Sequence, residues 1–390
     1  MEKETKGRLV TDAAELRAVV SGMRRAGRIG FDTEFVGEKS YYPRLCLVQL
    51  GTEDAVFAVD PLAVEDLSPL DELLFDPTIL KVVHAGGQDL KIVYQRTGRV
   101  PAPVFDTQVA AALLGHPVQA AYAAVVRGFL GVDVKKGHSY SDWCARPLSS
   151  SQLSYALDDV RYLPALHDRM VSRLRKEGRL AWIEPEFSAL ASPATYESPP
   201  EEEYRRVKGW TGLDPRRLAV LRGLIAWRER EARRRDVPRR RVLSDESALA
   251  IARSRAADEE ALRRVRGLEW KVGGETSAAV LDVVRDALAL REERLPGQAP
   301  SRPRGNGERS SVVPLLGALL RSRARAHRVA PELLANAEEL ERLAAGERDG
   351  LAVLSGWRLD LVGKELLALL DGRLSLFVRD GEAEIEERRK

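Results

Sequence analysis

The sequence predicts an α/β domain built on a mixed sheet, followed by one or two small all-α domains. The N-terminal part opens with strand-like runs and then alternates helical and strand-like segments, whereas the part after residue 204 follows a helical period. The chain of 390 residues is also longer than the roughly 100 to 200 residues of one ordinary domain. Several domains are therefore expected.

One strand of the predicted sheet is Arg28 to Val36. Apolar and β-branched side chains alternate here with Asp32 and Glu34. Because side chains two apart in a strand share a face, Asp32 and Glu34 point the same way while Phe31 and Phe35 pack behind them. The sequence therefore presents two carboxylates side by side.

The elements that follow this strand predict the mixed character of the sheet. Two apolar runs separated by a turn have the spacing of a hairpin or meander, and helices then alternate with a further strand. An antiparallel opening followed by this alternation favours helices on the faces of a mixed sheet. The expected strands are 44–51, 54–60 and 79–85, and the expected helices are 66–75, 88–96 and 105–115.

Two stretches of low apolar content divide the chain. The first is rich in Pro, Ser and Glu, and the second has Pro and Gly in a charged run that cannot bury a core. We therefore expect domains at 1–190, 204–292 and 312–390, with linkers near 183–203 and 294–311. The last two domains are predicted to be helical modules of similar size.

Composition limits where the protein works. With 44% hydrophobic and 31% charged residues, the chain has enough apolar material to fold and enough charge to stay in water. The N-terminus is polar, and nowhere is there the run of about 18 apolar residues that a membrane span needs. We expect a cytoplasmic protein without membrane contact, in which Cys46 and Cys144 are reduced thiols.

Charge is distributed unevenly along the chain. Residues 1–200 carry more Asp and Glu than Lys and Arg, whereas the remainder is basic, and the sum is +3. An acidic first half suggests metal chemistry, and a basic second half suggests attraction to a polyanion.

Two further acidic positions complete a set of four. Asp89 follows a strand and lies near a helix start, at the sheet edge where Asp32 and Glu34 are expected. Tyr155 and Asp159 are four apart on a helix that opens with the capping box Ser149 to Gln152. Four gathered carboxylates repel one another unless cations are bound. Two divalent ions held by shared carboxylates, roughly 3.5 to 4 Å apart, are a recurring device for phosphodiester cleavage. The pattern therefore predicts a metal-dependent nuclease.

The order D-x-E, then Asp in an HA-type motif, then Y-x-x-x-D resembles the DEDD exonuclease superfamily, and in detail the ribonuclease D family. The stretches 32–50, 105–111 and 141–163 continue the resemblance, which covers most of 8–180. It implies a ribonuclease H-like (DnaQ-like) fold. Residues 216–238 resemble the first helices of an HRDC domain, and 312–390 resembles a second such module only through its helical pattern and position.

This resemblance implies roles for the motif residues. Asp32, Glu34, Asp89 and Asp159 would hold two Mg²⁺ or Mn²⁺ ions, and Tyr155 would orient the attacking water. A phenol with an ordinary pKa near 10 is a poor general base, which favours positioning over proton abstraction. A sister subfamily has His where this chain has Ser154, so the chain resembles the Tyr type.

Several basic residues are candidates for contact with nucleic acid. Lys136 and Arg146 match ribonuclease D positions near the active-site motif and are expected to touch phosphate, with an internal salt bridge as the alternative for Arg146. Trp143 is expected to pack. In the HRDC-like module a basic run is either a solvated face or a phosphate-binding surface, and we favour the second because the neighbouring nuclease acts on a polyanion. This run comprises Arg233, Arg234, Arg235, Arg239, Arg240 and Arg241.

Three functions remain open at this point. The first is a 3'-5' exoribonuclease that acts on RNA 3' ends, with tRNA precursors as the leading substrate. The second is a 3'-5' DNA exonuclease, since discrimination depends on contacts to the 2'-hydroxyl that no motif displays. The third is a catalytically inactive nucleic-acid-binding scaffold, which the presence of all four acids disfavours. No Walker-type phosphate loop occurs, so no nucleotide cofactor is expected, and we expect a monomer.

Overall fold

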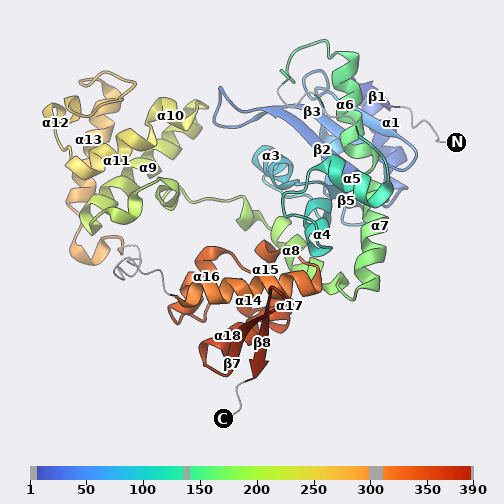
Figure 1. The fold of residues 1–390 in the computed structure, drawn as a ribbon. Coiled ribbons are helices and arrows are strands. Elements are labelled where there is room, and N and C mark those ends of the chain that lie inside the picture. Colours follow the sequence, from blue (N-terminus) through green and yellow to red (C-terminus); the bar gives the residue numbers. More distant parts are fainter. Residues whose placement is uncertain (1–6, 135–136, 138–140, 298–310, 388–390) are drawn as a thin grey trace. The chain divides into compact units, whose positions relative to one another are not determined.

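The computed structural model describes residues 7–134, 137, 141–297 and 311–387. Two compact units divide the chain (Figure 1). The first comprises Met1–Glu34, Cys46–Ser192 and Gly305–Lys390, and the second comprises Phe35–Leu45 and Pro193–Arg304. Each unit is described by itself.

A six-stranded mixed sheet forms the centre of the first unit. Its strand order is β1-β4-β3-β2-β5-β6. β3 and β4 are antiparallel, whereas β1 with β4, β2 with β5 and β5 with β6 are parallel. The strands are β1 Gly7–Val10, β2 Arg28–Val36, β3 Arg44–Gly51, β4 Val56–Val59, β5 Leu80–Val83 and β6 Val104–Asp106. The predicted mixed sheet is thus confirmed.

Helices cover this sheet and bury its apolar side chains. α6 packs on β4 and β1, and α7 packs on β5 (Figure 1). Ile29 and Phe31 of β2 are almost fully buried, as its alternating pattern requires, and Leu47 of β3 is buried as well. The helices are α1 Ala13–Arg24, α2 Ser68–Leu74, α3 Gly87–Thr97, α4 Thr107–Leu113, α5 Tyr122–Leu130, α6 Ser150–Arg161, α7 Leu163–Lys176 and α8 Ile183–Leu190.

Three local features differ from the expectations. A short strand, β6, directly precedes α4 in the segment expected to be one helix at 105–115. α8 occupies residues expected to be linker, because Phe187 packs on Phe105 with 4.9 Å between the ring centres. Cys46 and Cys144 form a disulfide with 5.0 Å between their Cα atoms, so the prediction of two reduced thiols is wrong. Their separation of 98 residues concealed that β3 and the segment before α6 are neighbours.

The C-terminal segment belongs to the same unit as the sheet. The rings of Trp182 and Trp357 stack with centres 4.6 Å apart, and Arg358 forms a 2.7 Å ion pair with Glu186. Arg179 donates hydrogen bonds to the carbonyl oxygens of Leu113 and Arg328, at 2.7 and 3.1 Å. These contacts join the C-terminal helices to α4 and to the region between α7 and α8.

This segment is not purely helical. A hairpin of β7 and β8 follows its helices, a feature that the helical pattern did not predict. The elements are α14 Val312–His327, α15 Pro331–Leu334, α16 Ala337–Ala344, α17 Gly356–Arg358, a π-helical turn Leu359–Gly363, α18 Lys364–Leu370, β7 Leu374–Arg379 and β8 Glu382–Glu387.

The second unit is a helical module with its own core. Leu221, Leu224 and Ile225 of α9 are fully buried against Ile251 and Val280. These residues belong to the apolar stripe expected for an HRDC-like module. Its helices are α9 Pro215–Arg235, α10 Arg239–Val242, α11 Asp245–Ser254, α12 Glu259–Arg263 and α13 Glu275–Leu288. Within the described ranges of both units, no helix is both long and apolar enough to cross a membrane.

Candidate active site

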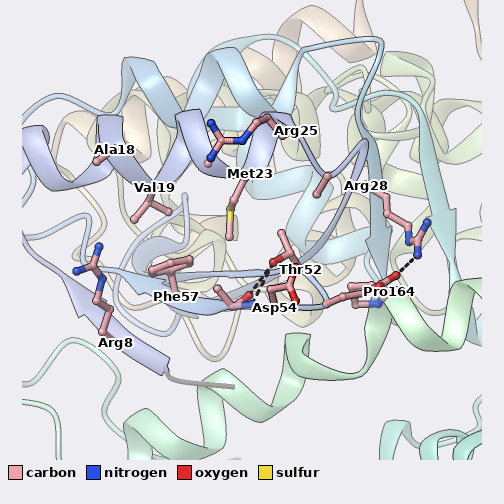
Figure 2. Close-up of a pocket in the computed structure, with 14 residues that line it drawn as sticks. Arg8, Ala18, Val19, Met23, Arg25, Arg28, Thr52, Asp54, Phe57 and Pro164 are labelled. Atoms are coloured by element: carbon pink, nitrogen blue, oxygen red, sulfur yellow. Dashed lines mark hydrogen bonds and ion pairs between the residues drawn. The ribbon is translucent and has the colours of Figure 1, made fainter. Parts of the chain in front are cut away.

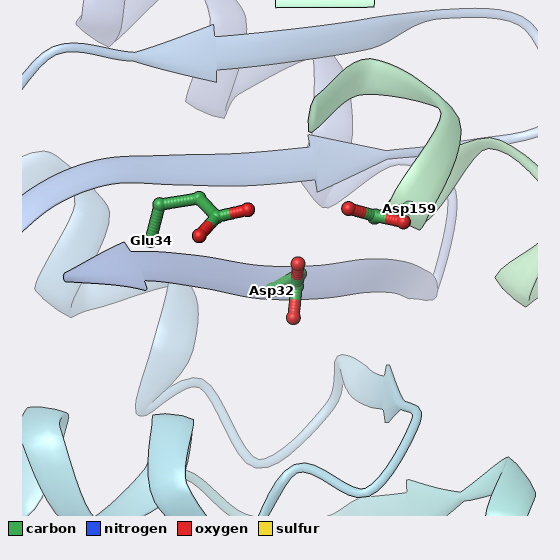
Figure 3. Close-up of side chains that lie close together, drawn as sticks. All are labelled: Asp32, Glu34 and Asp159. Carbon is green, nitrogen blue, oxygen red and sulfur yellow. The ribbon is translucent and has the colours of Figure 1, made fainter. Parts of the chain in front are cut away.

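Three carboxylates meet above the centre of the sheet. Asp32 and Glu34 extend from β2, and Asp159 extends from α6 toward that strand (Figure 3). One oxygen from each lies within 4.8 Å of the other two. Asp32 and Glu34 lie on the same face of β2, as their spacing predicts. The third acid, Asp159, belongs to a helix that is more than a hundred residues later in the chain.

α6 is set at its start by the capping box predicted from the sequence. The Ser149 hydroxyl accepts from the Gln152 amide at 3.2 Å, and the Gln152 side chain accepts from the Ser149 amide at 3.0 Å. These bonds satisfy amides that the first helical turn leaves without partners. Tyr155 lies one turn before Asp159, and its ring centre is 6.1 Å from that of the buried Trp143.

Two glycines let α6 approach the sheet closely. A Cβ atom on Gly30 of β2 would lie 2.7 Å from the carbonyl oxygen of Val160, and one on Gly51 of β3 would lie 2.6 Å from it. Both distances are too short for real carbon–oxygen contacts. Because Val160 follows Asp159 directly, these glycines allow Asp159 to reach the acids of β2.

The fourth acid, Asp89, lies beside the cluster rather than within it. It is the third residue of α3 and is 7% exposed. One of its oxygens, Oδ1, accepts a 3.1 Å hydrogen bond from the Thr33 amide and a second bond from the Thr33 hydroxyl. Asp89 is still near enough to raise the pKa values of Glu34 and Asp159. The structure therefore gathers three of the predicted acids tightly and places the fourth at their edge.

Burial and mutual repulsion raise the pKa values of these acids. Burial, followed by repulsion from Asp159 and Asp89, raises the pKa of Glu34 to about 8. Burial, followed by repulsion from Asp158 and Asp89, raises the pKa of Asp159 to about 7. Asp32 has a pKa well above its ordinary value, first because of burial and then because of the neighbouring acids. Burial raises the pKa of Asp89 to about 6, against the lowering effect of its bonds from Thr33.

This arrangement suits hard divalent cations. All ligand atoms on offer are carboxylate oxygens, which Mg²⁺ and Mn²⁺ prefer over softer ligands. The raised pKa values indicate that negative charge on these acids is unfavourable when no cation is bound. A bound cation would remove that repulsion, so these residues fit a metal site.

Two residues that the sequence analysis did not identify support the acids. Thr33 holds Asp89, as described above. The hydroxyl of Tyr122 donates to the carbonyl oxygen of Asp158 at 3.0 Å and accepts from the Tyr162 amide at 3.3 Å, at the end of α6. Thr33 was detectable because it stands between two acids, whereas the distance of Tyr122 along the chain gave no signal.

The basic residues near the active-site motif have different positions. Lys136 lies outside the described residues. Arg146 forms an ion pair with the buried Asp60 at 2.5 Å and donates to the Cys46 carbonyl oxygen at 2.6 Å. The internal salt bridge, one of the two alternatives for Arg146, is thus present. Trp143 is buried, in agreement with the expectation that it packs.

In the second unit, part of the basic run surrounds Tyr41. Arg233 and Arg239 donate to the Tyr41 hydroxyl at 2.8 and 3.2 Å, and this hydroxyl donates to the buried Glu229 at 2.9 Å. Asp236 accepts from the Tyr41 amide at 3.1 Å. These two arginines therefore have internal partners.

The other arginines of the run are also exposed, and three of them have acidic partners on the surface of the module. Arg234 and Arg235 pair with Glu231 at 2.7 and 3.7 Å, and Arg240 lies 3.6 Å from Glu269. Arg241 is exposed. Contact with nucleic acid stays a prediction for the whole run.

A separate pocket lies away from the acids. It has a volume of about 550 Å³ and is lined by α1, the ends of β1 and β4, and the turn between β3 and β4 (Figure 2). Arg28 on its wall is paired with Glu53 and Asp168. None of the four predicted acids lines this pocket, so it is not the active site.

Comparison with known proteins agrees with this geometry. The 3'-5' exonuclease family matches residues 8–175, and the HRDC domain family matches residues 217–284. Ribonuclease D of Granulibacter bethesdensis is 42% identical over 376 residues, which cover 96% of this chain and 95% of that protein. Ribonuclease D of Gluconacetobacter diazotrophicus is 43% identical over 372 residues, with 95% and 94% coverage.

A solved structure extends the agreement to the whole fold. The crystal structure of Escherichia coli RNase D, described as an exoribonuclease involved in structured RNA processing, matches with a TM-score of 0.83 and 30% identity. The match covers 94% of this chain and 99% of that one. The described C-terminal segment is therefore included in a fold shared along nearly the full length.

The sheet, the acidic cluster and the matched domain define a 3'-5' exonuclease of the DEDD class with a ribonuclease H-like fold. The similarity to ribonuclease D proteins extends over almost the entire sequence and identifies the family within this class. The chain belongs to the ribonuclease D family. It is a 3'-5' exoribonuclease with an HRDC domain, as the resemblance implied.

Proposed function

We propose that this enzyme trims the 3' ends of tRNA precursors with two divalent cations, Mg²⁺ or Mn²⁺. Asp32, Glu34, Asp89 and Asp159 would hold these cations. The observation that carries the proposal is the meeting of three carboxylate oxygens within 4.8 Å. The relative from Escherichia coli, which acts in structured RNA processing, supports a structured RNA as the substrate.

Each residue of the site has a defined task in this proposal. When bound, the cations supply an activated water and stabilise the departing 3'-oxygen. Asp32 and Glu34 present their oxygens from one strand face, which needs no rearrangement of the backbone. Tyr155, one helical turn from Asp159, orients the attacking water through its hydroxyl. Positioning of this kind converts binding energy into a lower barrier.

Basic residues would carry the contacts to the RNA backbone. Lys136 is proposed to touch a phosphate, and the arginine run from Arg233 to Arg241 is proposed to bind the RNA backbone. The Arg146 guanidinium already binds Asp60 and the Cys46 carbonyl oxygen, so no phosphate contact is proposed for it. Each phosphate neutralised releases counterions, so this affinity falls as salt rises. We also propose that the enzyme works in the cytoplasm, where tRNA precursors are accessible. We propose that it acts as a monomer.

One experiment tests both metal dependence and direction. An RNA labelled at the 5' end and the same RNA labelled at the 3' end are each digested while a chelator is titrated and Mg²⁺ is then restored. We expect a ladder from the 5' label, immediate release of mononucleotide from the 3' label, and full arrest by the chelator. Digestion that continues in excess chelator would refute the metal mechanism.

A second experiment tests the substrate. A tRNA precursor with a 3' extension is compared with an unstructured RNA and a DNA of matched sequence. Trimming that stops near the mature tRNA end supports the proposal. Equal rates on RNA and DNA would favour the DNA exonuclease alternative instead, because no 2'-hydroxyl contact would then matter.

A further inference from the structure

We infer that Thr33 is a positioning residue that holds the Asp89 carboxylate in place for cation binding. The inference rests on the proposed function, since it assumes that the acids bind divalent cations. Thr33 lies between Asp32 and Glu34 in the sequence, yet its own contacts go to the fourth acid. It touches neither substrate nor cation in this proposal and acts through Asp89.

The end of a strand ladder explains how Thr33 reaches Asp89. β2 pairs with β5 from Arg28 to Gly30, and β5 ends at Val83. Farther along β2 the Thr33 amide has passed the paired stretch, and it donates to Asp89 Oδ1 at 3.1 Å. The Asp89 carboxylate thus takes the place of the missing strand partner, and a buried amide keeps the hydrogen bond that it requires.

The Thr33 hydroxyl makes a second bond to the same oxygen. Two donors on Oδ1 restrict rotation of the Asp89 side chain, so that its other oxygen, Oδ2, keeps a fixed direction for a cation. Thr33 is only 5% exposed and Asp89 7%, so water does not compete well for these bonds. Partners of metal-binding carboxylates act in this way, and their loss typically lowers metal affinity or activity about 10- to 100-fold.

The chemistry of threonine separates this role from simple packing. Threonine is β-branched and therefore stiff about its first side-chain bond. Valine preserves that shape without the hydroxyl, whereas serine preserves the hydroxyl without the methyl group. If Thr33 only filled space, Thr33→Val would be harmless and Thr33→Ser would be harmful. If Thr33 positions Asp89, Thr33→Val weakens metal binding and Thr33→Ser leaves it nearly unchanged.

The test measures Mn²⁺ binding by titration calorimetry on the full-length protein, with thermal unfolding in chelator as the control for folding. We expect Thr33→Val to weaken Mn²⁺ affinity about 10- to 100-fold and to raise the Mn²⁺ concentration that gives half-maximal RNA digestion. Thr33→Ser keeps the hydroxyl and should bind Mn²⁺ within about threefold of wild type, well short of the loss expected for Thr33→Val, even if its midpoint of unfolding falls. Should Thr33→Val not fold, Thr33→Ser and Thr33→Ala make the same comparison, because both lack the γ-methyl group of threonine and only serine has the hydroxyl.

Two results would overturn the inference. Wild-type affinity in Thr33→Val would show that the hydroxyl is dispensable, and equal losses in the serine and alanine variants would assign the effect to packing. Either result leaves the proposed function intact if wild-type protein binds Mn²⁺ and Asp89→Asn reduces that binding. If the wild-type protein binds no Mn²⁺, both the proposed function and the inference fail.

Discussion

Asp159 is the residue whose replacement tests the cluster most directly, because among the three clustered acids of the described residues it is the one that comes from a helix. Asp159→Asn removes a charged ligand with little change of shape, and loss of a cation costs several kcal/mol of transition-state stabilisation. We expect RNA digestion to slow on the order of 10³-fold. The control is Asp158→Asn, since Asp158 is adjacent and pairs with Arg161 at 2.8 Å. Similar rates in both variants would contradict the assignment.

Tyr155 is expected to affect the chemical step without affecting cation binding. Tyr155→Phe removes only the hydroxyl that would orient the water. We expect the single-turnover rate to fall about 10²-fold, a typical value for a positioning group. Mn²⁺ affinity measured by calorimetry should stay at the wild-type level. An unchanged rate would exclude Tyr155 from the mechanism, and lost Mn²⁺ binding would give it a structural role instead.

The raised pKa values predict how pH changes the stability of the metal-free protein. The folded protein holds protons on Glu34 and Asp159 up to pKa values of about 8 and about 7, whereas in the unfolded chain these protons leave near pH 4. The folded state therefore binds more protons in this window, and the free energy of unfolding decreases as pH rises from about 4 to about 8.

Saturating Mg²⁺ is expected to bind the deprotonated acids and therefore to reverse this trend. We expect the increase in melting temperature on adding Mg²⁺ to be larger at pH 8 than at pH 6. Differential scanning fluorimetry at the two values measures it, and Glu34→Gln should reduce the difference. An equal increase at both pH values would show that these acids do not release protons when the cation binds.

Part of the site was predictable at the level of single residues. The four acids and Tyr155 stand in short motifs that carry their own spacing, so their selection needed no tertiary information. The hydrogen bonds from Thr33 to Asp89 and the disulfide of Cys46 with Cys144 depend on which segments become neighbours in space. Residue spacing along the chain does not contain that information.

At the scale of the structural elements, the segment before α6 is held by a buried ion pair in addition to the disulfide of Cys144. The Asp60 side chain is 4% exposed and that of Arg146 is 26% exposed. Burial raises the pKa of Asp60, but hydrogen bonds from Arg146 and the Leu62 amide outweigh it, so the pKa is lowered. Removing one partner of a buried pair leaves the other charge uncompensated.

We expect Arg146→Ala to lower the free energy of unfolding by about 2 to 3 kcal/mol, somewhat less than for a fully buried pair. Urea unfolding measures this change. The control is Arg127→Ala, which breaks an ion pair with Asp133 whose side chains are 74% and 80% exposed. Its free energy of unfolding should change by no more than about 0.5 kcal/mol. Unchanged stability with weakened RNA binding would instead support a phosphate contact for Arg146.

Long periodic elements were predicted well, and short ones were not. The strand expected at Arg28 to Val36 has those bounds in the structure, because nine alternating residues give a clear period. β6 has three residues and passes directly into α4, so its pattern is too short to separate from the helix. The β7–β8 hairpin follows helices in a region where a helical period dominated.

At the scale of the whole molecule, the C-terminal segment is part of the unit that holds the active site. Trp357 is 9% exposed and stacks on Trp182. Trp357→Ala would leave a large cavity there, with an expected cost of about 3 to 5 kcal/mol. Hydrogen exchange should then show amides of α7, α8 and α14 losing protection together. Loss confined to α14 would mean that the segment unfolds independently of the sheet.

Domain boundaries from composition captured only part of this organisation. The change of unit at Ser192 and Pro193 falls within the predicted linker at 183–203. The grouping of Phe35–Leu45 with the helical module, through Tyr41 and its arginines, was not visible in the sequence. The amino-acid composition of this short segment between β2 and β3 does not indicate that it belongs with a distant part of the chain.

The close approach at Gly30 and Gly51 bears on attempts to make this enzyme more heat-resistant. Exchanging glycine for alanine is a common stabilising strategy, because it reduces the freedom of the unfolded chain. Neither glycine has a positive backbone φ angle, so a survey of backbone angles would accept both as candidates. Yet an added methyl group at either position would press on Val160 and shift the neighbouring Asp159, so the exchange would cost both stability and catalysis.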